Sequence, residues 1–173
     1  MHNEQMGFPS GTVTLLFTEV EGSIRLWEAD RQAMAEASAR YARIVREQTE
    51  ASGGRVFKSV GEAFRAVVAD PAAALASAVA VQRAVGAELW PPGLSVRVRV
   101  ALHSGVCVDR DGDYFGPVVN RVARLLPAGH GGQVLVSGAT YELLAGWPPG
   151  GMGLCDLGEH RLKDLAGRSG CSR

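Results

Sequence analysis

The segment VTLLFTEVEGS, residues 13–23, is the one around which the rest of the chain is arranged. Its first half is apolar and rich in β-branched residues, which predicts a buried strand, and it ends at an acidic turn where Gly22 and Ser23 open a helix. A carboxylate at the tip of a strand binds hard cations through oxygen, and the free N–H groups of a helix start attract phosphate. The turn is therefore a candidate site for a metal–triphosphate complex. The alternative is that Glu19 and Glu21 are solvated acids that complement the helix dipole.

Composition predicts one globular domain with no large charged surface. The chain has 173 residues and is 46% hydrophobic, which is enough for one core, and we expect a flexible lead at 1–10, a domain at 11–165 and a polar tail at 166–173. Its 18 Lys and Arg balance 18 Asp and Glu, so neither nucleic acid nor an anionic membrane is an expected partner. No apolar run approaches the roughly 18 residues of a membrane span, and three widely spaced cysteines suit neither a disulfide framework nor a zinc site. A cytoplasmic protein is expected.

The periodicity predicts an α+β sandwich with a mainly antiparallel sheet. Residues 24–51 read as one long amphipathic helix, and residues 55–68 read as a hairpin around Gly61 and Glu62. Strict alternation in the hairpin would place Lys58 on the same, largely apolar side as Val56 and Val60, although an ordinary exposed strand lysine is the alternative. The remaining predicted elements are helices at 72–89, 118–126 and 137–144 and strands at 94–102, 133–136 and within 154–165.

Several polar residues of this pattern are candidates for chemistry. If the first strand lies beside the hairpin, Glu19 and Glu62 converge and supply two carboxylates for a two-metal site. Asn120 and Arg124 are four residues apart and share one face of a helix. His103, at the end of a strand, is more simply explained as a structural residue. The chain has neither a P-loop nor a strand-linked G-x-G-x-x-G motif.

Four segments together resemble the class III adenylate/guanylate cyclase catalytic domain, in particular its bacterial, mycobacterial-type branch. They are LFTEVEGS at 16–23, FKSVGEAF at 57–64, ALHSG at 101–105 and GDYFGPVVNRVARL at 112–125. The resemblance extends over residues 11–165, and LGEHRLKDL at 157–165 is similar to the C-terminal segment of the same branch. It implies a ferredoxin-like sandwich that converts ATP to 3′,5′-cyclic AMP and pyrophosphate with two Mg²⁺ or Mn²⁺ ions per site.

By position, the resemblance implies a metal and triphosphate half of the site. Glu19 and Glu62 stand where the family has its metal-binding aspartates, and Val20 lends a backbone carbonyl to the metal. Lys163 matches a triphosphate-binding lysine. The triphosphate cradle comprises Val20, Glu21, Gly22 and Ser23.

The resemblance also implies a nucleoside half and a partner. Lys58 and Asp113 match the pair that reads adenine, Asn120 orients the ribose, and Arg124 stabilises charge on the phosphates. Family members work as head-to-tail dimers with sites shared between protomers, so a homodimer with ATP as substrate is implied, with no nucleic acid and no membrane.

This sequence departs from the family at the metal positions, where both aspartates are glutamates. Magnesium tolerates geometric error poorly, and an error of about 1 Å in a catalytic array costs roughly 100-fold in rate. We therefore expect a weakly active adenylate cyclase. The alternative is a catalytically silent nucleotide-binding or dimerising regulatory module.

Overall fold

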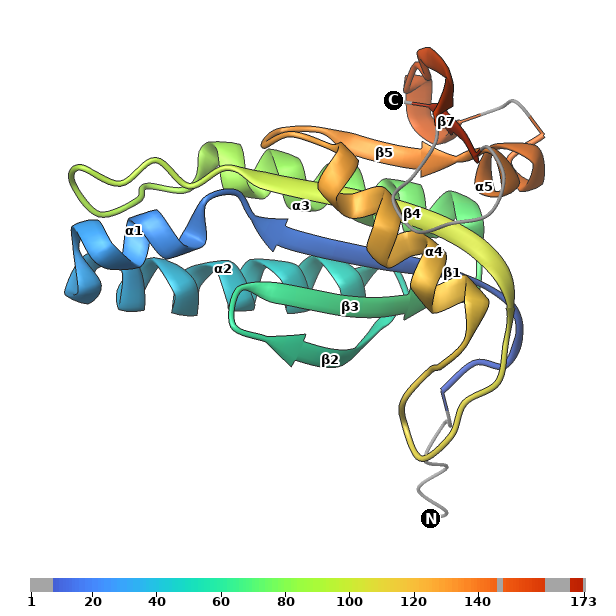
Figure 1. Cartoon of the computed structure of the whole chain (residues 1–173), viewed down its shortest axis with the longest axis horizontal. Coiled ribbons are helices and arrows are strands. Elements are labelled where there is room, and N and C mark those ends of the chain that lie inside the picture. Colours follow the sequence, from blue (N-terminus) through green and yellow to red (C-terminus); the bar gives the residue numbers. More distant parts are fainter. Residues whose placement is uncertain (1–7, 146–147, 161–168, 173) are drawn as a thin grey trace.

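The computed structural model describes residues 8–145, 148–160 and 169–172. These residues form an α+β fold in which helices flank one sheet (Figure 1). The strands are β1 Gly11–Val20, β2 Arg55–Val60, β3 Ala63–Val68, β4 Val98–Cys107, β5 Val134–Ser137, β6 Asp156–His160 and β7 Ser169–Ser172. The helices are α1 Ser23–Ala29, α2 Arg31–Ala51, α3 Pro71–Ala87, α4 Pro117–Leu125 and α5 Gly138–Leu143, with short 3₁₀ turns at Leu126–Ala128 and Pro149–Gly151.

In the described part of the chain, the sheet has seven strands in the order β2-β3-β1-β4-β5-β7-β6. Every neighbouring pair is antiparallel except β4 and β5, which run parallel, so the predicted mainly antiparallel sheet is confirmed. β1 lies between β3 and β4 and places its C-terminal end beside the β2–β3 turn.

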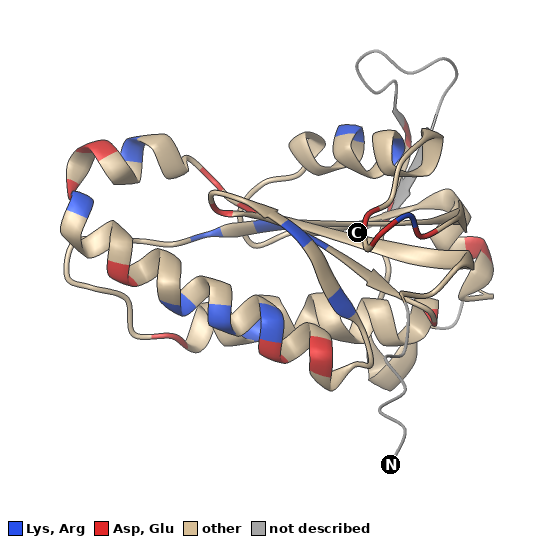
Figure 2. Cartoon of the chain, turned by 90° about the horizontal axis from the view of Figure 1, so that it is seen from below, with Lys and Arg blue, Asp and Glu red and all other residues tan. Residues whose placement is uncertain are grey.

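Two apolar cores lie on the two faces of this sheet, and Figure 2 shows helices on both sides of it. Leu16 and Val20 of β1 belong to the core shared with α2 and α3, where Tyr41 is fully buried. Phe17 and its odd-numbered neighbours face the other core, which α4 covers with Val119, Val122 and Leu125. This alternation along β1 sends Glu19 to the same face as α4.

The predicted single helix over residues 24–51 is wrong, because the chain breaks at Asp30. Asp30 is extended, with φ −153° and ψ 99°, and its side chain accepts a hydrogen bond of 2.9 Å from the Ala33 N–H. Asp30 therefore caps α2 and ends α1 after seven residues. The sequence did not predict this break because residues 24–51 contain neither Gly nor Pro.

The prediction that Lys58 lies on the same side of the hairpin as Val56 and Val60 is wrong in part. The β2–β3 register shifts between Val56 and Lys58, so that Val56 lies opposite Ala66 whereas Lys58 lies opposite Arg65. Ala66 belongs to the core under α2 and α3, and the Arg65 guanidinium lies 5.2 Å from the Phe17 ring on the other face. The bulge thus turns Lys58 away from the face of Val56 and towards the face that carries α4.

Other boundaries move by a few residues. The predicted strand at 94–102 begins and ends later, at Val98–Cys107, and the segment expected as a polar tail contains β7. Ser137 caps α5 as predicted, accepting a hydrogen bond from the Thr140 N–H. None of the helices in the described ranges has the combination of length and apolar character that crossing a bilayer needs.

Candidate functional site

The C-terminal end of β1 opens into a cavity of about 390 Å³. Glu19 lies at its edge, and its Oε2 is 3.2 Å from the Nε of Arg99 on the adjacent strand β4. The Nε–H of Arg99 is not aimed well enough at this oxygen to count as a hydrogen bond, so the contact is an ion pair without a directed bond. The cavity is lined by Glu19, Val20, Gly22, Ser23, Ile24, Arg25 and Arg99.

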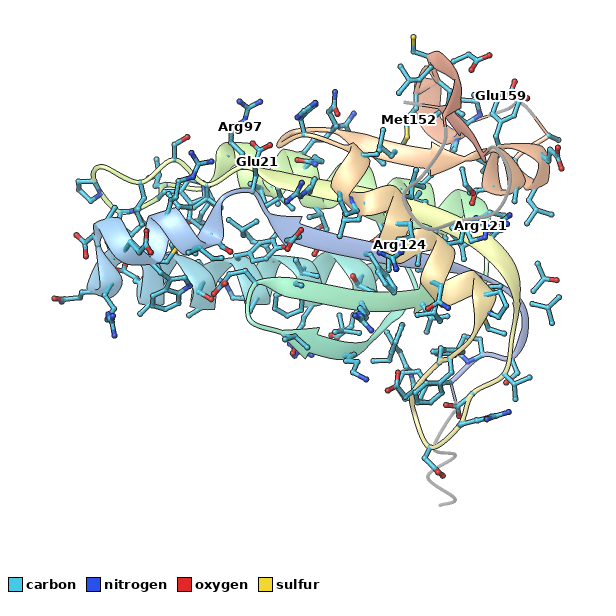
Figure 3. All side chains as sticks on the ribbon, in the orientation of Figure 1. Glu21, Arg97, Arg121, Arg124, Met152 and Glu159 are labelled. Atoms are coloured by element: carbon cyan, nitrogen blue, oxygen red, sulfur yellow. The ribbon has the colours of Figure 1, made fainter. Side chains whose placement is uncertain are left out.

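The turn after β1 is fixed by backbone contacts. Gly22 has φ 67° and ψ 26°, a left-handed conformation that favours glycine, and the Arg25 side chain lies over it. The Glu21 N–H donates a hydrogen bond of 2.8 Å to the Arg97 carbonyl, and Figure 3 shows the two residues side by side. The Glu21 carboxylate lies 3.9 Å from the Nδ1 of His130. The predicted cradle residues therefore lie together, with arginines rather than the acidic side chain of Glu21 inside the cavity.

Glu62 reaches the site from the two-residue turn between β2 and β3. The β1–β3 register places Ala63 opposite Glu19, so Glu62 lies at the same end of the sheet as Glu19. Its Oε1 accepts hydrogen bonds from Trp27 Nε1 and Ser38 Oγ, both 3.0 Å long. Burial raises the pKa of Tyr41, and the charges of Glu19 and Glu62 raise it further, so both carboxylates lie within electrostatic reach of this one hydroxyl.

These groups fit a hard cation. Two carboxylates and the backbone carbonyl at Val20 are oxygen donors of the kind that Mg²⁺ and Mn²⁺ prefer. No cluster of three or more His, Cys, Asp or Glu side chains is found in the described ranges, at this end of the sheet or away from it, so a metal here would rely on two carboxylates and backbone oxygen. Glu19, Glu62 and Val20 are the candidates to hold such ions.

A second polar pair forms between β2 and the arm that follows β4. Lys58 Nζ donates to Asp113 Oδ2 at 2.7 Å, although 55 residues separate them in the sequence. Each is next to an aromatic residue, and the Phe57 and Tyr114 rings meet edge to face with centroids 4.9 Å apart. The hydrogen bond from Lys58 lowers the pKa of Asp113, which keeps its carboxylate charged.

The predicted face of α4 is exposed. Val119, Val122 and Leu125 bury one side of the helix, and Asn120 and Arg124 lie on the exposed side with Arg121. Arg121 and Arg124 occupy different positions along α4 (Figure 3). The helix carries no acidic residue, so it presents positive charge next to the cavity-bearing face of the sheet.

His103 is structural, as expected. It is 5% exposed, and its Nδ1 lies 2.7 Å from Ser137 Oγ. Ser137 continues a buried hydroxyl network through Thr140 and Ser104 to Thr14, which ties α5 to β4 and β1. Burial, followed by the charge of Arg121, lowers the pKa of His103 to about 4.

Residues 8–170 match the family model described as the adenylate and guanylate cyclase catalytic domain. The chain belongs to this cyclase family. An uncharacterized protein of Mycobacterium tuberculosis is 40% identical to it over 159 residues, covering 91% of this chain and 53% of the relative. An adenylate cyclase of Schizosaccharomyces pombe is 32% identical over 169 residues, covering 82% of this chain and 10% of that protein. The cyclase domain thus spans about half the length of the mycobacterial relative.

Solved cyclase structures share the fold. An adenylate cyclase structure from Trypanosoma brucei in the monomeric state has a TM-score of 0.88 at 26% identity and covers 99% of this chain and 93% of that chain. The adenylyl cyclase CyaB from P. aeruginosa has a TM-score of 0.77 at 20% identity, covering 95% of this chain and 93% of that one. The predicted cyclase sandwich is confirmed.

Reasoning from sequence missed three residues of the candidate site, Arg25, Arg99 and Trp27. Arg25 lines the cavity from α1. Arg99 alternates with apolar residues in β4, and such a charge is usually solvent-facing, so only the β1–β4 register reveals its place beside Glu19. The sequence pattern placed Trp27 in the apolar stripe of a helix, whereas its indole N–H donates a hydrogen bond to Glu62. Lys163, predicted to bind triphosphate, lies outside the described residues.

Proposed function

We propose that this cyclase domain is an adenylate cyclase that converts ATP to 3′,5′-cyclic AMP and pyrophosphate with low activity. The observation that carries the choice of adenine is the Lys58–Asp113 pair, with its 2.7 Å contact. A lysine donor and a carboxylate acceptor complement the acceptor and donor on the adenine edge, and such a pair penalises a base that leaves its members unmatched. The cytoplasm, where ATP is available, is the proposed place of action.

The chain's own residues divide the reaction between them. Arg25 and Arg99 line the cavity beside the β1 turn and would bind the triphosphate, and Asn120 on α4 would orient the ribose so that its 3′-hydroxyl faces the α-phosphate. Arg124 would stabilise the charge that develops on the phosphate oxygens as pyrophosphate leaves. Glu19, Val20 and Glu62 would hold two Mg²⁺ or Mn²⁺ ions, which supply electrostatic stabilisation of the phosphates when bound.

A head-to-tail homodimer is the proposed working state. Glu19 and the β1 turn lie at one end of the sheet, and Lys58 and Asp113 form a separate group at the arm after β4. Near this arm, Val106, Val108 and Phe115 are 71%, 61% and 60% exposed, an apolar surface that suits a protein partner. Two copies would complete two sites from opposite halves.

A silent nucleotide-binding module is the second candidate, and one observation favours it. Both metal-site glutamates already have protein partners, Glu19 with Arg99 and Glu62 with Trp27 and Ser38. Magnesium would have to displace the first of these contacts.

The test is cyclic-nucleotide formation by the purified chain with ATP or GTP, in Mg²⁺ and then in Mn²⁺. We expect slow turnover of ATP, faster in Mn²⁺ because it is less strict about coordination geometry, and little turnover of GTP. Lys58→Gln should lower kcat/KM for ATP at least 10-fold, whereas Arg110→Gln, on the exposed part of the same arm, should not. Nucleotide binding without product in either metal would favour the silent module, and GTP turnover equal to that of ATP would overturn the assignment of the base.

A further inference from the structure

The Glu62 carboxylate lies in a tight turn and accepts hydrogen bonds from two residues that are distant in the sequence. One of its oxygens, Oε1, accepts two hydrogen bonds of 3.0 Å, one from the indole of Trp27 on α1 and one from the hydroxyl of Ser38 on α2. These donors are 35 and 24 residues away in the sequence, and all three side chains are half-buried. The carboxylate is thus fixed by two separate helices.

The two donors share one oxygen of the carboxylate, Oε1. An indole N–H is a donor only, so Trp27 can do nothing at this contact but donate to the carboxylate. With both donors on Oε1, Oε2 keeps its lone pairs for another ligand. Carboxylates that bind metals are commonly oriented by such outer hydrogen bonds, and loss of one typically costs 10- to 100-fold in metal affinity.

The geometry requires the longer side chain. An aspartate at position 62 would be shorter by one methylene, about 1.5 Å, and would draw its oxygens out of reach of donors that now lie at 3.0 Å. The sequence analysis treated the extra methylene of Glu62 as a cause of low activity. In the structure, this methylene brings the carboxylate within reach of two donors, Trp27 and Ser38, which a shorter acid would not reach.

We infer that Trp27 and Ser38 are positioning residues, which hold Oε1 of Glu62 so that Oε2 is presented to the metal. The inference rests on the proposed metal role of Glu62. It also links two parts of the site, because Trp27 lies one helical turn after Ser23 in α1, whose first residues follow the proposed triphosphate cradle. Movement of α1 would therefore move the Glu62 ligand.

The test measures metal binding directly. Mn²⁺ affinity is determined by electron paramagnetic resonance of free Mn²⁺ in the presence of 3′-deoxy-ATP, which has no hydroxyl with which to cyclise. Trp27→Phe keeps the ring and removes the N–H, and we expect it to weaken Mn²⁺ binding about 10-fold or more, with Ser38→Ala acting in the same direction. The matched control is Trp90→Phe, because Trp90 is also half-buried and donates to the Val85 carbonyl at 3.1 Å, away from the site.

A second background separates positioning from a structural role. In chains that carry Glu62→Asp, Trp27→Phe should change Mn²⁺ affinity less than about twofold, because the shorter acid has already lost the contact. Thermal unfolding of each variant establishes that it is folded. Equal effects of Trp27→Phe in both backgrounds, or equal effects of Trp27→Phe and Trp90→Phe, would overturn the inference and leave the proposed function standing. If the unmutated chain binds no Mn²⁺, the inference and the proposed function are both wrong.

Discussion

Glu19 and Glu62 have the same side chain at the two proposed metal positions, yet their surroundings differ. Glu19 is paired with a cation, Arg99, across the β1–β4 register, while Glu62 is held by two neutral donors. A cationic partner competes with a metal ion for the carboxylate, whereas neutral donors orient the carboxylate without cancelling its charge. The two glutamates should therefore respond differently to shortening.

We predict that Glu19→Asp raises the Mg²⁺-dependent rate of cyclic AMP formation several-fold, because the shorter acid withdraws from Arg99 and better suits the strict geometry of magnesium. Glu62→Asp should lower the rate, because it loses the donors Trp27 and Ser38. The measurement is the initial rate at saturating ATP over a range of Mg²⁺ concentrations. An equal gain from both substitutions would show that side-chain length alone limits this site.

At the scale of elements, pattern predicted the kinds of strand and helix but not their local irregularities. The alternation of β1 and the hairpin about Gly61 and Glu62 follow directly from sequence period. The bulge between Val56 and Lys58 does not; it lies at Phe57, whose ring packs against that of Tyr114, a residue far along the chain. The bulge turns Lys58 to the face of Asp113, so the sequence singled out both members of this pair but not the face of the strand on which Lys58 lies.

The hydroxyl network under α5 gives an element-scale prediction about pH. The pKa of His103 is lowered to about 4 in the fold, against 6.5 for an ordinary histidine, so between these values the unfolded chain binds more protons. The free energy of unfolding should therefore fall as pH drops from 6.5 towards 4, by about 3 kcal/mol at most from this residue.

Chemical denaturation of the unmutated chain and of His103→Gln across this pH window measures the effect. The variant should lose part of the pH dependence, because glutamine has no proton to gain. His130→Gln is the control, since the His130 side chain is 80% exposed and lies outside the hydroxyl network under α5. Equal slopes for His103→Gln and the unmutated chain would exclude a buried neutral imidazole.

At the scale of the whole molecule, the question is whether one chain holds a complete site. The cavity at the end of β1 and the Lys58–Asp113 pair are separate groups, and α4 lies exposed on the same face of the sheet (Figure 1). The resemblance to a family suggests roles for these residues, but the periodicity of the sequence does not place them relative to one another. That arrangement follows from the strand order β3-β1-β4.

We predict complementation between two inactive chains. Glu62→Ala and Arg124→Ala should each abolish cyclic AMP formation, because each would remove one half of every site. A mixture should recover up to about a quarter of the unmutated activity, since random pairing makes half of the dimers mixed and each mixed dimer has one intact site of two. Activity is measured against mixing ratio at a concentration where sedimentation shows dimer. A flat background at every ratio would mean that each chain carries its own complete site.

The strand order also determines when the protein can fold during synthesis. β1 finds its first neighbour, β3, within about fifty residues, but its other edge is covered by β4, where Thr14 pairs with Ser104. Until the chain has been translated past Cys107, a ten-residue strand of mostly buried side chains has one open edge, and such an edge invites pairing with another nascent chain. Fragments that stop before β4 should therefore aggregate rather than fold, and the first strand made gains its second neighbour only after nearly ninety further residues have been added.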